Sequence, residues 1–414
     1  MTILRIGSLK IEKVSEKTIC RKLKAAREDE TIEEIHFWQI DVSNAVLKGL
    51  SKLLIRDGRR FHNLKLLSCT GHVKDVVSMV MDYNSAGTLV LSGSQIEDET
   101  LLAVNQGLRT NQSVKTLRIL GAQFVNERIE FLEGLSRNCA LEELDLTRSH
   151  LAPGVVKSIS RALSKNRHLQ ILKLEQCGLE DQGIAEIVHA ISEDSSIRKL
   201  NLSENSAHSA ALDALAELIY NSDMLCSLNL SHQMLVEDLD LNGLNHAVMA
   251  LRSNTSLRNL DISGNQFGDE VVRALAECLS SNTTLKAVDI SESHISEHGL
   301  EIFAHHLPHF HGLVTLNVSG NAMSERAAEC LVHGLKDNRI LQSLGPVDTS
   351  YSCSHMMEHY LDLNIAGRRA MQNDVPIALW PQLLARAGSI LNDDCGRNEN
   401  AIFSLLRGPA LFER

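Results

Sequence analysis

The sequence of 414 residues is poor in aromatic side chains, which make up only 4% of it, and it holds just 6 prolines. Leucine, isoleucine, valine and alanine must therefore fill the interior. No apolar run approaches the roughly 20 residues of a membrane span, and the first residues lack the apolar core of a signal peptide. The 9 cysteines include no CxxC pair. That pattern excludes a disulfide framework and predicts a reducing compartment, the cytoplasm or alternatively the nucleus.

The common catalytic and nucleotide-binding motifs are also missing. We find no GxxxxGK[ST], no GxGxxG after a strand, no GxSxG and no HExxH. One HxxEH match occurs at His355, Glu358 and His359, and on a helix it would place both histidines on one face, as a zinc site needs. Such enzymes also need a distant third ligand and a large supporting domain, and the stretch that follows His359 is too short to supply one. We therefore interpret the match as accidental and expect no metal, no cofactor and no catalysis.

Charge is unevenly distributed along the chain. The formal net charge is −11, yet residues 1–65 carry 14 basic and 9 acidic side chains. The remainder is strongly acidic, and an acidic surface repels phosphate backbones. We therefore expect no nucleic-acid partner. From the missing membrane span and the missing catalytic motifs, we also expect no membrane contact and no small-molecule substrate.

A repeated pattern with a period of about 28 residues dominates the sequence. The segment Leu169-Gln-Ile-Leu-Lys-Leu-Glu-Gln-Cys-Gly-Leu179 follows LxxLxLxx(N/C/S)xL, and related copies recur along the chain. The copies begin at Ile32, Phe61, Ala86, Val114, Leu141, Leu169, Ile197, Leu225, Leu257, Leu285, Leu313 and Leu341. The near-constant spacing of neighbouring copies predicts a stacked repeat array rather than separate globular domains.

Each repeat combines two periods. The LxL segment alternates, which predicts a short strand, and about ten residues later apolar residues recur every three or four positions, which predicts a helix. Stacking such units gives an α/β solenoid with an inner parallel sheet and outer helices. Asparagine follows or ends several helices, where we expect left-handed C-terminal caps. These positions are Asn166, Asn221, Asn254, Asn282 and Asn338.

The length of the unit and the helix in each copy resemble the ribonuclease-inhibitor class of leucine-rich repeats. That class includes the Ran-GTPase-activating proteins and the sensor domains of NOD-like receptors. The resemblance covers residues 32–347, about twelve units, and implies a horseshoe with a concave binding face. The loop Arg-Asn-Arg-Leu-Glu-Asn-Gly and the acidic tail that a Ran activator would supply are absent.

Both ends differ from the array. Residues 1–31 contain a predicted helix from Glu16 to Arg27 and form an N-terminal cap. Residues 348–414 predict helices at 354–371, 376–387 and 399–407, forming either a C-terminal cap or a docking module. The strings Leu363-Asn-Ile-Ala-Gly-Arg-Arg369, Leu379-Trp-Pro381 and Leu405-Leu-Arg-Gly-Pro-Ala-Leu-Phe412 resemble the tail of leucine-rich-repeat proteins of diatom-like algae.

Strand alternation predicts which side chains line the inner face of the sheet. The residue between the two apolar positions of LxL points there, and a flanking row follows two residues later. The central row changes from basic to acidic and amide-rich along the array, which suits a basic partner surface. We predict partner contacts at Trp38, Arg118, Asp145, Lys173, Asn201, Asn229, Asp261, Asp289 and Asn317. The alternative is that the recurring Asp or Asn before Leu-Ser only shapes the strand turns.

Other residues receive specific interpretations. We expect Cys69 and Cys177 to be structural thiols and His306 to be a packing residue. Arg56, Arg59 and Arg60 form a candidate anionic docking spot. The interval between the copies at Leu225 and Leu257 is longer than its neighbours because of a short insertion around 236–240, which we place on a rim loop.

Taken together, these patterns predict a non-enzymatic scaffold that binds a protein partner. One alternative, implied only by the class resemblance, is a regulator of a small GTPase. Another is an adaptor that uses the helical tail to join a larger assembly such as a ubiquitin ligase. The sequence leaves the partner's identity and the oligomeric state open.

Overall fold

The computed structural model describes residues 7–12, 14–55, 60–93, 96–124, 132–192, 195–233, 237–266, 268–346 and 350–365. The chain forms two compact units, Met1–Asn229 and Leu230–Arg414. Within the described ranges, no helix combines the length and apolar character that crossing a membrane requires.

The first unit is built on a parallel sheet whose strands follow one another in chain order. Their bounds are β1 (Gly7–Glu12), β2 (Ile32–Trp38), β4 (Phe61–Leu67), β6 (Ala86–Ser92), β7 (Thr116–Leu120), β9 (Glu143–Asp145), β11 (Ile171–Lys173), β12 (Lys199–Asn201) and β13 (Ser227–Asn229). Leu144, Leu172 and Leu200 lie directly opposite one another, as the repeat predicts. Strand β1 adds a member that the sequence pattern did not indicate. Two short pairs, β3 (Asp41–Val42) with β5 (Thr70–Gly71) and β8 (Gln123–Phe124) with β10 (His150–Leu151), lie beyond the sheet.

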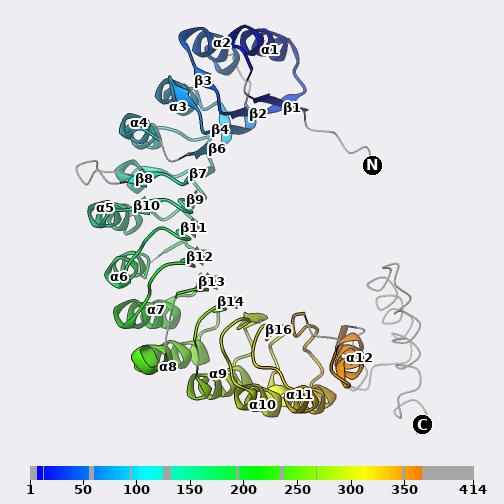
Figure 1. The fold of residues 1–414 in the computed structure, drawn as a ribbon. Coiled ribbons are helices and arrows are strands. Elements are labelled where there is room, and N and C mark those ends of the chain that lie inside the picture. The colour runs from blue at the N-terminus through cyan, green and yellow to red at the C-terminus, as the bar shows by residue number, and fades with distance from the viewer. Residues whose placement is uncertain are drawn as a thin grey trace, which may run out of the picture. The chain divides into compact units, whose positions relative to one another are not determined.

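Helices cover one face of this sheet (Figure 1). They are α1 (Glu16–Glu28), α2 (Asn44–Leu54), α3 (Val73–Asp82), α4 (Asp98–Leu108), the short 3₁₀ helix η1 (Glu133–Arg137), α5 (Pro153–Leu163), α6 (Asp181–Ala190) and α7 (Ser209–Asn221). Leu172 from the sheet and Ile159, Ile184 and Ile187 from the helices are fully buried. Each such side chain stabilises the fold by roughly 1.5–3 kcal/mol through burial. The helix predicted over Glu16 to Arg27 is confirmed as α1.

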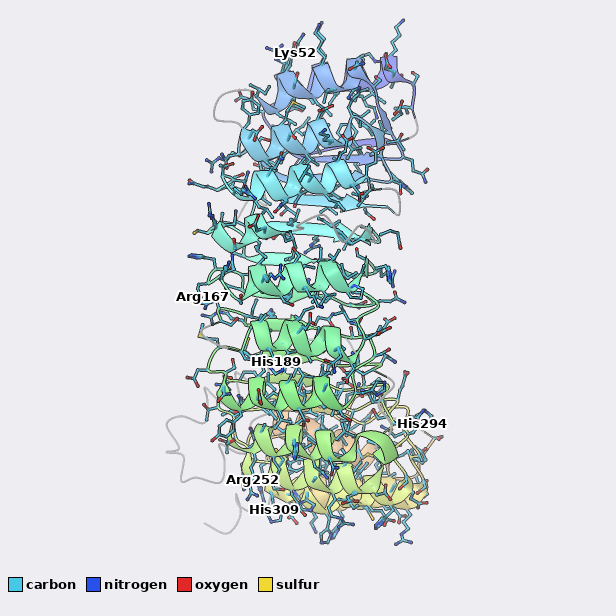
Figure 2. The ribbon with its side chains drawn as sticks, turned by 90° about the vertical axis from the view of Figure 1, so that its left-hand side faces the viewer. Lys52, Arg167, His189, Arg252, His294 and His309 are labelled. Carbon is cyan, nitrogen blue, oxygen red and sulfur yellow. The ribbon has the colours of Figure 1, made fainter. Side chains whose placement is uncertain are left out.

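The helix-covered side of the first unit is polar at its surface. Figure 2 shows the helices lying parallel to one another, with Arg167 and His189 labelled on this side. The Arg167 guanidinium donates to the carbonyl of Ser164 over 2.8 Å. The His189 ring lies 3.8 Å from the Glu217 carboxylate on the next helix. Because the apolar side of every helix faces the sheet, what remains outside is a solvated surface.

The second unit repeats the same arrangement. Its strands are β14 (Asn259–Asp261), β15 (Ala287–Asp289) and β16 (Thr315–Asn317), paired in parallel. Its helices are α8 (Glu237–Ser253), α9 (Asp269–Ser281), α10 (Glu297–His306), the 3₁₀ helix η2 (Leu307–His309), α11 (Glu325–Asp337) and α12 (Ser354–Ile365). The placement of the extra residues on a rim loop is wrong, because Glu237–Asp240 form the beginning of α8 and lengthen that helix. Helix α12 confirms the first part of the helix predicted over 354–371, and residues 366–414 lie outside the described residues.

Asparagines beyond the helices form a ladder between repeats. The Asn166 amide donates to the carbonyls of Leu135 and Asn138 in the preceding repeat, and its Oδ1 accepts from the backbone N–H groups of His168 and Leu169. Asn138, Asn282 and Asn338 make the same four contacts in their own repeats.

The predicted left-handed caps are therefore wrong. Asn282 has φ −79° and ψ 122°, and Asn338 has φ −76° and ψ 138°, both extended. An extended backbone turns the amide back toward the previous repeat, where it satisfies helix-end carbonyls that would otherwise be buried without a partner. Asn221 departs from the pattern because it ends α7, and Ser222 instead accepts from the N–H groups of Met224 and Leu225.

Candidate functional site

The face of each sheet opposite the helices carries the predicted central row. Parallel pairing sets His36, Lys65, Val90, Arg118, Asp145, Lys173, Asn201 and Asn229 opposite one another in the first unit. Asp261, Asp289 and Asn317 are set opposite one another in the second unit. We call this side the open face, because no described helix covers these strands there (Figure 1). Apart from Trp38, the predicted contact residues thus lie in one row on each unit.

The charged side chains of the row in the first unit form ion pairs with one another and with a neighbouring carboxylate. A single oxygen of Glu143, Oε1, accepts from Arg118 Nη2 over 3.1 Å and from Lys173 Nζ over 2.9 Å. Arg118 Nε also lies 3.9 Å from Asp145 Oδ2. Two cations and two carboxylates therefore form one cluster across β7, β9 and β11. A partner gains little from the charge of Arg118 or Lys173 alone, since each already has a counter-ion.

Glu143 is the residue of this cluster that the sequence interpretation missed. Burial acts to raise the pKa of its carboxyl, but the hydrogen bond and charge of Lys173 and the charge of Arg118 outweigh it and hold the pKa below the usual range. The signal was present in the sequence. Glu143 precedes Asp145 by two positions, so strand alternation puts both on the same face.

The amide part of the row shapes the strand turns. Asn201 Oδ1 accepts from the Ser203 backbone N–H over 2.9 Å and from the Ser203 hydroxyl over 2.8 Å. Its amide nitrogen donates to Glu175 on the adjacent repeat over 3.0 Å. The recurring Asn-Leu-Ser pattern therefore does close the turn, as the structural alternative predicted. The side chain is nevertheless half-buried rather than hidden, so part of it stays available to a partner.

The second unit repeats this turn with carboxylates. Asp261 and Asp289 each accept through Oδ1 from the N–H and hydroxyl of the serine two residues later. Asp289 Oδ2 also accepts from the amide of Asn317 over 2.8 Å. Among the described residues, Asp261 Oδ2 has no hydrogen-bond partner. In the described part of the second unit, Asp261 Oδ2 is therefore an uncompensated carboxylate oxygen on the open face.

Trp38 stands apart from the rest of the predicted set. Its side chain is 50% exposed, so it is not packed away beneath helix α1, and it lies opposite Leu67 in the sheet. In the central row nearby, Lys65 has no carboxylate partner within the described ranges. His36 lies 3.3 Å from Glu34, while burial and then the charge of Lys65 lower its pKa. An exposed tryptophan is the side-chain type that most often anchors protein contacts.

The remaining candidates have structural surroundings. The Cys177 thiol is fully buried, donates to the Leu146 carbonyl, and burial raises its pKa to about 12. Burial also raises the pKa of the Cys69 thiol. His306 Nδ1 lies 3.1 Å from the Ser280 hydroxyl. These contacts support structural roles for all three.

The HxxEH residues lie on α12, where His355 and Glu358 are exposed and His359 is half-buried. Across the part of the chain that the structure describes, no three His, Cys, Asp or Glu side chains group where they could hold a metal ion. Arg60 is exposed, whereas Arg56 and Arg59 lie outside the described residues.

Comparison with known proteins bears on the fold. The family model described as "Leucine Rich repeat" matches residues 165–188 and 253–276. None of the curated protein sequences compared with the chain matches it.

Solved structures offer distant similarities. The Leiomodin-1 Actin-Binding Site 2 is 19% identical, covering 42% of this chain and 97% of its own, with a TM-score of 0.37. The internalin inlF of Listeria monocytogenes is 13% identical over 77% of this chain and 75% of its own, with a TM-score of 0.43. The yeast Rad7 and Elc1 complex is 14% identical over 80% of this chain and 82% of that chain, with a TM-score of 0.46. At such identities these structures give no indication of function.

The fold assignment rests on the chain itself. Copies of LxxLxLxx(N/C/S)xL pair strand to strand in parallel, each followed by a helix on the same side, and the family model matches one stretch in each compact unit. The chain has the fold of an α/β leucine-rich-repeat solenoid.

Proposed function

We propose that this protein is a non-enzymatic interaction scaffold that binds a protein partner through the open face. Leucine-rich-repeat proteins generally act as protein-interaction scaffolds, and repeat arrays use their extended faces for this purpose. From the length of its repeat unit, we also propose that the chain belongs to the ribonuclease-inhibitor class of leucine-rich repeats. The observation that carries the proposal is the central row itself, in which polar side chains are held in fixed register on the one sheet face that no described helix covers.

The hydrogen bonds within the row support its use for recognition. Because Asn201 and Asp261 are held by their turn serines, their side chains lose little rotamer freedom when a partner binds. The internal neutrality of the Arg118 cluster argues against recognition by long-range charge there. We therefore expect partner contacts to concentrate on the amide positions of the first unit and on Asp261 of the second.

Bulky substitutions on the open face test the proposal. The full chain carrying N201R and N229R, and separately the chain carrying D261R, is used to capture partners from a cell extract with quantitative mass spectrometry. Matched controls are E217R on α7 and E277R on α9, two exposed glutamates on helices. We expect a partner recovered by the unsubstituted chain and by both controls to fall at least tenfold with one of the open-face variants. Retention by both open-face variants, together with loss in the helix variants, would place the binding surface on the helices.

A further inference from the structure

In one repeat, the last apolar position of the repeat pattern is occupied by glycine and therefore carries no side chain. In several other repeats this position carries a buried apolar side chain, as at Val42, Phe124, Leu151, Leu179 and Ile295. In the copy that begins at Phe61 the position is Gly71. Its φ is +77°, and a Cβ there would lie 2.5 Å from Asp41 Oδ1 and 2.7 Å from the Val42 carbonyl oxygen. The positive φ and these close approaches therefore require glycine at position 71.

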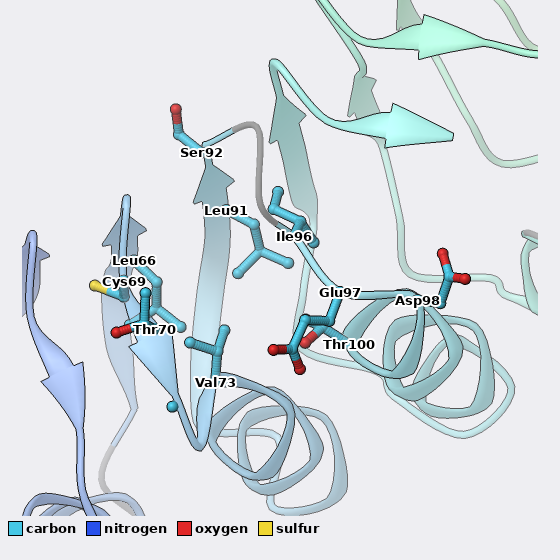
Figure 3. A pocket seen from close by; sticks show the side chains of 11 residues that line it. Leu66, Cys69, Thr70, Val73, Leu91, Ser92, Ile96, Glu97, Asp98 and Thr100 are labelled. Carbon is cyan, nitrogen blue, oxygen red and sulfur yellow. The ribbon is translucent and has the colours of Figure 1, made fainter. Parts of the chain in front are cut away.

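Gly71 lines a recess of about 360 Å³ (Figure 3). Its apolar walls are Leu66 and Leu91 from two strands, Val73 from α3, and Ile96. The volume is at the low end of the range for ligand sites, so it suits one or two side chains rather than a cofactor. The thiol of Cys69 also lines the recess and lies within hydrogen-bond distance of the carbonyls of Phe37 and Leu67.

The polar part of the recess is negatively charged. Glu97 immediately precedes α4, is exposed, makes no capping hydrogen bond, and has no cationic partner in the described part of the chain. Figure 3 shows its carboxylate directed across the recess toward Val73, whereas the carboxylate of Asp98 points away. Glu99, two residues further on, is already paired with Lys74 over 2.7 Å. The recess thus combines apolar walls with one uncompensated carboxylate.

We propose that this recess binds a lysine or arginine side chain of the partner protein. The aliphatic stem lies between Leu66, Leu91 and Ile96, and the cationic end meets Glu97. Long basic side chains bury their methylene groups along apolar surface while the charge reaches a polar rim. The inference rests on the proposed function and names the chemistry of one contact within it.

The exposed Trp38 extends the site along the same edge of the sheet. Trp38, Leu67 and Ser92 lie opposite one another on adjacent strands, and Ser92 lines the recess. Two strand spacings separate Trp38 from Ser92, about 10 Å, which an extended peptide covers in about three residues. The preferred partner segment therefore carries an apolar residue three positions from the lysine or arginine.

A peptide titration tests the recess directly. The probe is acetyl-Leu-Ala-Ala-Arg-Ala-Ala-Leu-amide, which presents leucine on either side of the arginine and so serves both chain directions. It is added to the full chain, and binding is followed by the methyl NMR signal of Ile96. A second peptide with glutamate in place of arginine tests charge. We expect the arginine peptide to shift the Ile96 signal and the glutamate peptide to leave it unchanged.

Two variants and one control complete the experiment. E97Q should weaken binding about fivefold, the measured size of a favourable exposed ion pair. E99Q removes the same charge two residues away, outside the recess, and should bind as the unsubstituted chain does. V73W should fill the recess and weaken binding at least tenfold, with circular dichroism confirming that it is folded. If V73W does not fold, the peptide affinities of E97Q and E99Q still show whether Glu97 contacts the cationic side chain.

Three results would overturn the proposal. They are equal binding of both peptides, no shift at Ile96, or equal affinity of E97Q and E99Q. If E97Q and V73W still capture a partner that N201R/N229R or D261R loses, the recess proposal fails and the proposed function stands. If the recess variants lose a partner that the open-face variants keep, the recess is supported and the central row is not the contact surface.

Discussion

The asparagine ladder makes the sharpest stability prediction. Replacing Asn166 by alanine removes four hydrogen bonds, of 2.7 and 3.0 Å to the preceding repeat and 2.8 and 2.8 Å within its own turn. Asn166 is only 5% exposed, so water cannot readily replace them. At about 1 kcal/mol per bond, and more where a buried group is left without a partner, Asn166→Ala should lower the free energy of unfolding by about 3–5 kcal/mol. That is a large share of the stability of an ordinary domain.

Asn201→Ala is the matched control. Asn201 also makes three hydrogen bonds, but it is half-buried on the open face, where water can take their place. We expect Asn201→Ala to lower the free energy of unfolding by less than about 1 kcal/mol. Because the two side chains make similar numbers of hydrogen bonds, four and three, the difference in unfolding free energy between the two variants mainly reports burial.

Urea denaturation followed by circular dichroism gives the stability change. Hydrogen exchange locates it, and the amides of His168 and Leu169 should exchange faster in Asn166→Ala because Oδ1 no longer accepts from them. In a repeat array the effect should concentrate in neighbouring units. A loss of less than about 1 kcal/mol, or one no greater than in Asn201→Ala, would refute the view that the ladder joins the repeats.

Three further predictions concern other parts of the first unit. Gly71→Ala should cost about 1–2 kcal/mol in thermal unfolding because φ is +77° and the new Cβ would contact a backbone oxygen at 2.7 Å, and an unchanged melting temperature would contradict this. In the folded state the pKa of Glu143 lies below its usual value. Its ionised carboxylate therefore stabilises the fold at pH values above the ordinary glutamate pKa, and this stabilisation is lost as the pH falls through the lower folded pKa. Glu143→Gln should therefore lower the free energy of unfolding by about 0.5 kcal/mol at pH 7, and the difference from the unsubstituted chain should become smaller in acid. A difference that does not change with pH would contradict this prediction. Thiol labelling with mass spectrometry should modify exposed Cys139 and leave Cys177, whose pKa is raised to about 12, unmodified until the chain unfolds.

The repeat pattern was sufficient to predict the strand and helix of the repeats and the register between neighbouring repeats. It did not predict β1 or the short pairs β3–β5 and β8–β10. A shift of one residue would move Leu144 or Leu172 from the core to the open face, so burial excludes that shift. The same alternation placed Asp145 and Lys173 correctly in one row. These features depend on local periodicity, which a single sequence displays.

Features that depend on contacts between repeats were harder to predict. The conformation of Asn166 is set by carbonyls in the preceding repeat, far from it in the sequence. The left-handed conformation occurs instead at strand-turn residues such as Arg148, Gln176 and Glu204. These are not glycines, so the sequence does not indicate a left-handed backbone there. The glycine at position 71 stands out only when equivalent positions of several repeats are compared, and the recess that it lines is formed by side chains from several elements. Helix α8 shows that additional residues can lengthen a helix instead of a loop.

Site-specific crosslinking tests the central claim most directly. A photoreactive phenylalanine analogue is placed at Lys199 or Asn259, two exposed strand positions that share the face of the central row, and at Glu217 on α7 as the control. The proposed function predicts covalent capture of the partner from Lys199 or Asn259 and none from Glu217. Capture from Glu217 alone would show that the partner binds the helices, and the assignment of the open face would then be wrong.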